Sequence, residues 1–216
     1  MSYKQITENL RIKDFNKNEF VELVMFDSNF REYMVKELLV SKDIMLYYHS
    51  YYVLDVATKV NGEKLYKYWN VFEELLQDEN SYKRDIGITL IANLVEVDDD
   101  NRFENIYEKY IARINDEKFM TAQCCVRSLK QIIPNQKFRD RIINDFLLVH
   151  EKTVFNRKQM ELLKYDILVA FDIVYLEASE VQRVIMKEYM DECTNSISPK
   201  TKRFAKKLIK KYVNQL

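Results

Sequence analysis

Residues 71–97 read VFEELLQDENSYKRDIGITLIANLVEV, and the rest of the chain is organised around copies of this unit. Two apolar segments with helical spacing flank a short polar turn. The turn carries Asp78, and Arg84 follows six residues later. Gly87, Leu90 and Leu94 then recur at intervals of three and four residues, which is the spacing of one helix face. The unit is therefore predicted to be a pair of helices joined by a turn.

This unit recurs on both sides of the first stretch at a nearly constant spacing. Equivalent turn positions are 37 and then 38 residues apart, at Ser41, Asp78 and Asp116. The second helices then align column by column, and one column holds only small residues, which let two helices approach closely. This small column consists of Ser50, Gly87 and Cys125, and Ala205 continues it 80 residues after Cys125. The interval leaves room for one less regular unit before the last helix.

Helix pairs that recur at this interval predict one all-α domain over residues 1–216, a right-handed α-solenoid of about five to six HEAT-like helix pairs. Residues 1–29 are expected to form a degenerate N-terminal cap, because a terminal repeat presents a more polar outer face. The stretch 137–176 has helical periodicity but does not align with the other units. It is either a distorted repeat or a functional insertion.

Several residues are expected to set the helix ends. Gly62 is expected to close the helix before it in the left-handed conformation. Ser198 is expected to cap the basic C-terminal helix, 198–216, with Pro199 as its first helical residue.

The acidic turn at Asp78, the arginine at position 84 and the small and aliphatic residues that follow resemble the consensus of HEAT repeats, which belong to the armadillo-like superhelical proteins. In the units before and after, Tyr47 and Ala122 stand in place of the arginine. Residues 80–88, NSYKRDIGI, also look like a small bacterial HEAT-like family of uncharacterised proteins. The resemblance implies that Asp78 and Arg84 bond between neighbouring turns, and it implies no catalytic mechanism.

The composition agrees with helices and excludes some functions. Only two Gly and two Pro occur, whereas a sheet protein needs many turns. Basic and acidic residues are equal at 34 each, whereas a nucleic-acid binder usually has a basic excess. Residues 198–216 depart from this balance with seven basic residues and no acidic one. This basic patch is either a solvated face or a contact for an acidic partner, and it includes Lys202, Arg203, Lys206, Lys207, Lys210 and Lys211.

The cysteines and the apolar segments indicate a cytoplasmic protein. Three cysteines occur, and two of them, Cys124 and Cys125, are neighbours that rarely pair with each other. We expect all three to be reduced thiols. The first residues have no apolar core of signal-peptide length, and no apolar run approaches the ~20 residues that span a bilayer. No membrane partner is therefore expected.

The sequence offers no pattern for catalysis, metal binding or a cofactor. Gly62 and Gly87 are too far apart for a phosphate-binding loop. His49 and His150 have no flanking ligands, and no CxxC pair occurs. Cys125 falls in the buried small column, and no histidine is placed to activate Cys124. We therefore predict a non-catalytic protein without a metal ion or cofactor.

Polar and aromatic columns of the second helices predict a binding face. Tyr48 and Tyr52 lie one turn apart, and their column partners in later units are polar. Exposed tyrosines on a concave wall favour recognition of another protein. The alternative is that these tyrosines pack on neighbours with their hydroxyls in water. The predicted concave face, which would bind an unidentified protein as a scaffold or adaptor, comprises Tyr48, Tyr52, Asp85, Thr89, Gln123, Arg127 and Lys130.

A second hypothesis belongs to a different class of protein. Bacterial alkylpurine DNA glycosylases also fold as HEAT-like solenoids of about this size, which makes nucleic acid the alternative partner. Such an enzyme needs a basic groove, an aromatic residue near the base and a carboxylate. Asp55 or Asp85 could supply the carboxylate. Trp69 is expected on a first helix, in the outer layer, where its ring packs against the core instead of facing a bound base. A third hypothesis is a structural subunit that docks through its basic end.

Overall fold

The computed structural model describes residues 3–149 and 155–212, and within these ranges every regular element is a helix. The predicted all-α class is therefore confirmed. The stretch 137–176, for which helices were expected, lies partly outside the described residues at positions 150–154, as does the end of the basic helix after Tyr212. The helices are α1 (Tyr3–Leu10), α2 (Lys17–Phe26), α3 (Ser28–Val40), α4 (Ile44–Val60), α5 (Glu63–Tyr66), α6 (Trp69–Leu75), α7 (Ser81–Leu94), α8 (Arg102–Ile111), α9 (Phe119–Ile132), α10 (Gln136–Leu147), α12 (Arg157–Val174), α13 (Glu180–Cys193) and α14 (Pro199–Tyr212).

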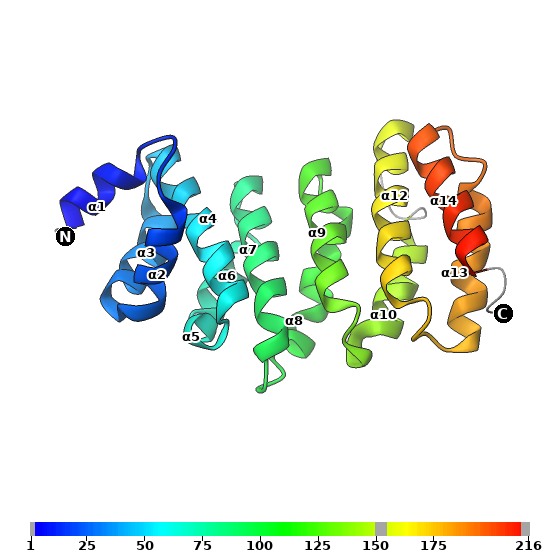
Figure 1. The fold of residues 1–216 in the computed structure, drawn as a ribbon, viewed down its shortest axis with the longest axis horizontal. Helices are drawn as coiled ribbons and strands as arrows, with labels where there is room; N and C mark the ends of the chain where they lie inside the picture. The colour runs from blue at the N-terminus through cyan, green and yellow to red at the C-terminus, as the bar shows by residue number, and fades with distance from the viewer. Residues whose placement is uncertain (1–2, 150–154, 213–216) are drawn as a thin grey trace.

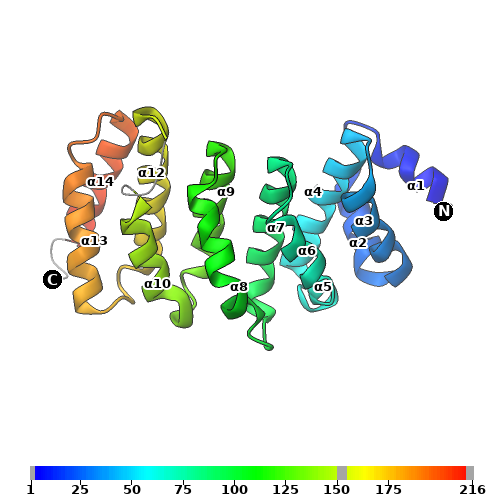
Figure 2. The same ribbon diagram turned by 180° about the vertical axis from the view of Figure 1, so that it is seen from behind.

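The helices follow one another in chain order along the long axis of the molecule (Figure 1). We call α4, α7, α9, α12 and α14 the second-helix layer, because each of them packs on the next. Helices α8, α10 and α13 lie behind this layer, and Figure 2 shows them from that side. Within the pairs, α3 packs on α4, α6 on α7 and α13 on α14.

Capping side chains decide where most helices begin. Asp43 accepts a hydrogen bond from the backbone N–H of Leu46 at the start of α4, and Asn80 accepts one from Tyr82 at the start of α7. The expected Ser198 cap is confirmed, since its Oγ accepts from the Thr201 N–H at 3.3 Å. Each such cap satisfies a backbone donor that the helix itself cannot satisfy.

Two expectations about turns were wrong. Gly62 has φ −62° and ψ −34°, which is right-handed helical backbone, because α5 begins at the very next residue. Asn101 adopts the left-handed conformation instead, at φ 56° just before α8. The first helix of this unit is also split into α5 and α6, where we expected one helix.

The predicted small column is buried where neighbouring helices meet. Ser50, Cys125 and Ala205 are each 0% exposed. Gly87 approaches α6 so closely that a Cβ atom built on it would lie 2.9 Å from the carbonyl oxygen of Phe72. Small side chains at these positions therefore allow the close packing that the sequence pattern predicted.

Polar bonds join residues about one unit apart along the whole row. Asn93 donates to Asp55 Oδ1 at 2.9 Å, a sequence separation of 38 residues. Arg139 and Glu177 are also 38 residues apart, with Nη2 and Oε2 at 2.7 Å. Lys211 reaches Asp172 across 39 residues, with Nζ and Oδ1 at 2.7 Å. Each unit is thus tied to the next by side chains at nearly the same interval.

Candidate functional site

A groove opens on the second-helix layer between α4, α7 and α9. It has a volume of about 350 Å³, and we call it the tyrosine groove. Three helices supply its walls, so that only the packing of successive units creates it. The side chains that line it include Tyr48, Tyr51, Tyr82, Asp85, Thr89, Met120, Cys124 and Arg127.

The groove brings together four of the seven residues expected on the concave face, namely Tyr48, Asp85, Thr89 and Arg127. Tyr52 lies beside them, with 45% of its surface exposed and its ring 6.2 Å from that of Tyr48.

Gln123 and Lys130 do not line the groove. Gln123 was expected on the exposed face but is only 4% exposed, because Asp166 of the next second helix covers it and accepts its Nε2–H at 2.8 Å. Lys130 is half-buried on α9 and does not line the tyrosine groove.

Aromatic rings form one wall of the groove. Tyr82 of α7 meets Tyr48 of α4 edge-on at 6.0 Å, and Tyr51 also lines the groove. Such edge-to-face pairs are a favourable aromatic geometry. Tyr82 was missed in the sequence analysis, although its position 37 residues after Met45 and 38 before Met120 could have revealed a further exposed column.

That column holds exposed apolar side chains on four successive second helices. Thr121 and Thr201 lie at the same position relative to the small column, and their hydroxyls donate to the carbonyls of Ser81 and Glu161 in the preceding second helix. Ser81 and Glu161 therefore occupy equivalent positions in α7 and α12. The residues that follow them, Tyr82 and Leu162, are then equivalent as well. We call the aligned residues the apolar row: Met45, Tyr82, Met120 and Leu162, which are 37%, 58%, 62% and 46% exposed.

Asp85 places a carboxyl group with one unsatisfied oxygen in the groove. Its Oδ1 atom is buried and has no hydrogen-bond partner. Burial raises the pKa of the Asp85 carboxyl, and the charge of Asp116 adds to the rise, while the Thr121 hydroxyl and the Arg84 guanidinium oppose it. The neighbouring arginines are committed to other carboxylates, because Arg84 bonds to Asp116 and Arg127 bonds to Asp166.

Asp85→Asn is expected to raise the free energy of unfolding at pH 7 by about 1 kcal/mol. The reason is that burial costs a neutral amide less desolvation free energy than it costs a carboxylate with an unsatisfied oxygen. The pKa of Asp85 is higher in the folded state, so protonation at lower pH restores this stability to the wild type. The gain should therefore shrink as the pH falls. Urea titrations at pH 7 and pH 4.5 measure it, with the exposed Asp140→Asn on α10 as the control. A gain that is the same at both pH values would contradict this explanation.

Cys124, which also lines the groove, is not placed to act as a nucleophile. Its Sγ lies 3.6 Å from the carbonyl oxygen of Asp85 and 3.6 Å from the Thr89 hydroxyl. Burial, together with the charge of Asp85, raises the pKa of the Cys124 thiol to about 11. The thiol is therefore protonated at neutral pH, and a thiolate is the form that reacts.

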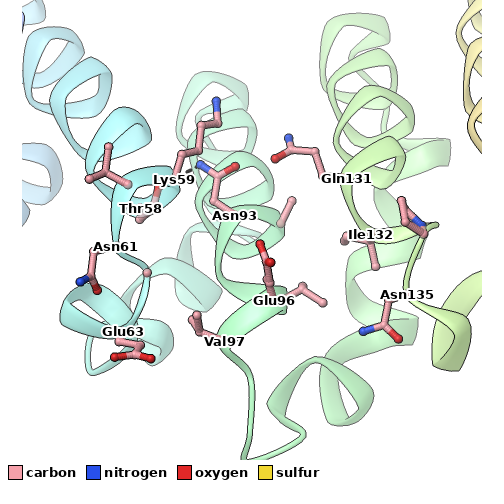
Figure 3. Close-up of a pocket in the computed structure, with 15 residues that line it drawn as sticks. Thr58, Lys59, Asn61, Glu63, Asn93, Glu96, Val97, Gln131, Ile132 and Asn135 are labelled. Carbon is pink, nitrogen blue, oxygen red and sulfur yellow. Dashed lines mark hydrogen bonds between the residues drawn. The ribbon is translucent and has the colours of Figure 1, made fainter.

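A larger and more polar groove lies at the carboxyl ends of α4, α7 and α9. It has a volume of about 850 Å³. Figure 3 shows Asn93, Glu96 and Gln131 facing it from neighbouring helices, with Lys59 beside them. Gln131 also lines the tyrosine groove, so the two grooves adjoin on one surface. We call it the polar groove.

The other residues considered for chemistry are structural. His49 is buried, where its Nδ1 bonds to the Leu10 carbonyl and its ring stacks on Phe15 at 4.2 Å. Trp69 is 0% exposed in the other layer, and Asp55 bonds to Lys59 and Asn93. Within the described ranges, no group of His, Cys, Asp and Glu residues is arranged to hold a metal ion. No helix in these ranges is long and apolar enough to cross a membrane.

The basic patch lies on the last helix of the row. α14 buries Thr201, Ala205, Leu208 and Tyr212, so its basic residues point away from the core. Of the six predicted patch residues, Lys211 pairs with Asp172 at 2.7 Å. Lys202 is half-buried, and the other four are exposed.

The structure thus defines the class of this protein as all-α, a row of paired helices with two adjoining grooves on one layer. No protein family model matches the sequence, and a search of the curated proteins found no significant match. The residues of the surface itself are therefore the basis for the functional proposals below.

Proposed function

We propose that this chain is a HEAT-like α-solenoid that binds another protein along its second-helix layer and acts as a non-catalytic scaffold. The nearly constant separation of the bonded pairs supports a repeat architecture, since each unit repeats its contacts with the next. The packing of every second helix on its successor supports the same arrangement. An array of this kind presents a long surface to a partner.

The apolar row is the observation that carries the proposal. Its four side chains are exposed, although burial of methionine, leucine and tyrosine side chains usually stabilises a protein. Methionine and tyrosine are also enriched at protein interfaces. Adjacent helices are ~9 Å apart, so the row spans roughly 30 Å. An extended segment of about nine residues covers that distance.

Substitution of the row should remove binding without unfolding the protein. In Tyr82→Ser with Met120→Ser, two exposed anchors are lost, and capture of a partner from the native lysate is expected to fall by at least about tenfold. Val181→Ser is the matched control, because Val181 is 69% exposed on α13 in the other layer. Equal capture of the same partner by all three proteins would contradict the proposal. Circular dichroism should show unchanged helix content in each variant.

A gel shift with duplex DNA at low salt tests the alternative of a DNA-binding protein. Of the residues considered for that chemistry, Asp85 lines a groove, whereas Trp69 is buried. The scaffold proposal predicts no shift at micromolar protein concentration. A shift at low salt that weakens steeply as salt is added would favour the alternative, because phosphate contacts by basic residues depend strongly on salt concentration.

A further inference from the structure

A protein segment bound along the apolar row would pass over the tyrosine groove at one point along its length. Tyr82 and Met120 belong both to the apolar row and to the groove. A segment on the row therefore passes the groove opening, where one of its side chains can enter. This inference rests on the function proposed above and concerns the chemistry of that side chain.

The charge in the groove selects among the side chains that could enter. Asp85 is the acidic residue that lines it, and its Oδ1 has no partner within the described part of the chain. An apolar side chain would cover this carboxylate and leave it unpaired, and an acidic one would repel it. A basic side chain would instead bring the opposite charge next to the Asp85 carboxylate.

The aromatic wall favours the same occupant. Cations are attracted to the faces of tyrosine rings. Elsewhere on its surface, this protein places its own basic side chains over tyrosine rings. Lys200 lies 3.8 Å from the ring centre of Tyr165, and Arg102 lies 4.7 Å from that of Tyr66. Tyr48 and Tyr82 present comparable rings beside Asp85 with no cation on them among the described contacts.

The size of the groove suits a single side chain. Its volume of about 350 Å³ lies at the lower end of the ~300–1,000 Å³ range of small-ligand pockets. We propose that the tyrosine groove is a receptor for one lysine or arginine side chain of a partner segment, with Asp85 as its charge partner and with apolar residues of the segment on either side along the row. Arg127 at the rim stays paired with Asp166 and leaves Asp85 to the ligand.

A titration followed by nuclear magnetic resonance tests the receptor directly. The probes are N-acetyl-arginine methylamide, N-acetyl-lysine methylamide and the citrulline counterpart, which has the shape of arginine without its charge. Saturable shifts of the Thr89, Met120 and Cys124 resonances are expected with arginine or lysine. Citrulline should bind at least about tenfold more weakly. Asp85→Asn should weaken arginine binding similarly, and Asp140→Asn should not.

Any of three results of this titration would overturn the receptor. One is the absence of saturable shifts at these three residues. Another is equal binding of arginine and citrulline, and the third is equal binding by the wild type and Asp85→Asn.

Selection of random twelve-residue peptides on the immobilised protein separates this inference from the scaffold proposal. Peptides that require Tyr82 and Met120 and that carry a basic residue would support both. Peptides that require Tyr82 and Met120 but lack lysine and arginine would leave the scaffold standing and overturn the receptor. Selection that does not depend on these two residues would contradict the scaffold proposal itself.

Discussion

Asp116→Ala is expected to lower the free energy of unfolding by about 3–5 kcal/mol, because it leaves a buried guanidinium without its counter-charge. Arg84 donates from Nε and Nη2 to the two oxygens of Asp116, at 2.9 and 2.8 Å. Both residues are buried, at 5% and 4% exposure. Asp116 also accepts the backbone N–H of Lys118 and pairs with Arg113, so several contacts are lost together.

Urea titration followed by circular dichroism measures this loss as a lower midpoint. Asp191→Ala is the control, since its pair with Lys187 lies on the surface of α13 and should contribute about 0.5 kcal/mol or less. If Asp116→Ala does not fold, Asp116→Asn keeps the shape and part of the hydrogen bonding and should show an intermediate loss. Equal midpoints for Asp116→Asn and the control would contradict a stabilising role for the buried pair.

Gly87→Val is expected to cost about 3 kcal/mol, because it forces α7 away from α6. A Cβ atom on Gly87 would lie 2.8 Å from Leu75 Cβ and 2.9 Å from the Phe72 carbonyl oxygen, and neither atom can move without its backbone. Gly87→Ala should cost about 2 kcal/mol, because its better helix propensity offsets part of the clash.

Gly62→Ala provides the matched control for this prediction. Gly62 has right-handed helical backbone, and the atom nearest to its added Cβ is a side-chain methyl carbon of Val97 at 3.0 Å. A side chain can shift to make room, and alanine reduces the entropy of the unfolded chain. The free energy of unfolding should therefore change by less than about 0.5 kcal/mol. Thermal unfolding of the three variants and the wild type checks the order, and similar losses at both glycines would contradict it.

The expected bond between neighbouring turns is confirmed for Arg84 but not for Asp78. Arg84 crosses to Asp116, which is the residue equivalent to Asp78 in the next unit. Asp78 receives no arginine from the unit before it, because Tyr47 occupies that position. Its carboxylate instead accepts the backbone N–H of Asn80 and lies 3.5 Å from Lys83. Only one such arginine bridge therefore forms between these three turns.

The candidate site was partly predictable because helical periodicity identifies the columns. Tyr48, Asp85, Thr89 and Arg127 were assigned to one face, and all four line one groove. Gln123 belongs to the same columns, yet Asp166 covers it. A column shows which way a side chain points from its own helix, but the distance to the next helix decides whether it is exposed.

The sequence by itself determined the all-α class and the small column at the helix contacts, because these depend on local propensity and on spacing along one chain. The tertiary structure alone decided that Tyr82 stands exposed beside Tyr48, and that one oxygen of Asp85 is buried without a donor. Residues more than 30 apart supply the surroundings of each of these side chains. Their burial and charge environment therefore depend on how closely successive units pack, which no single helical pattern encodes.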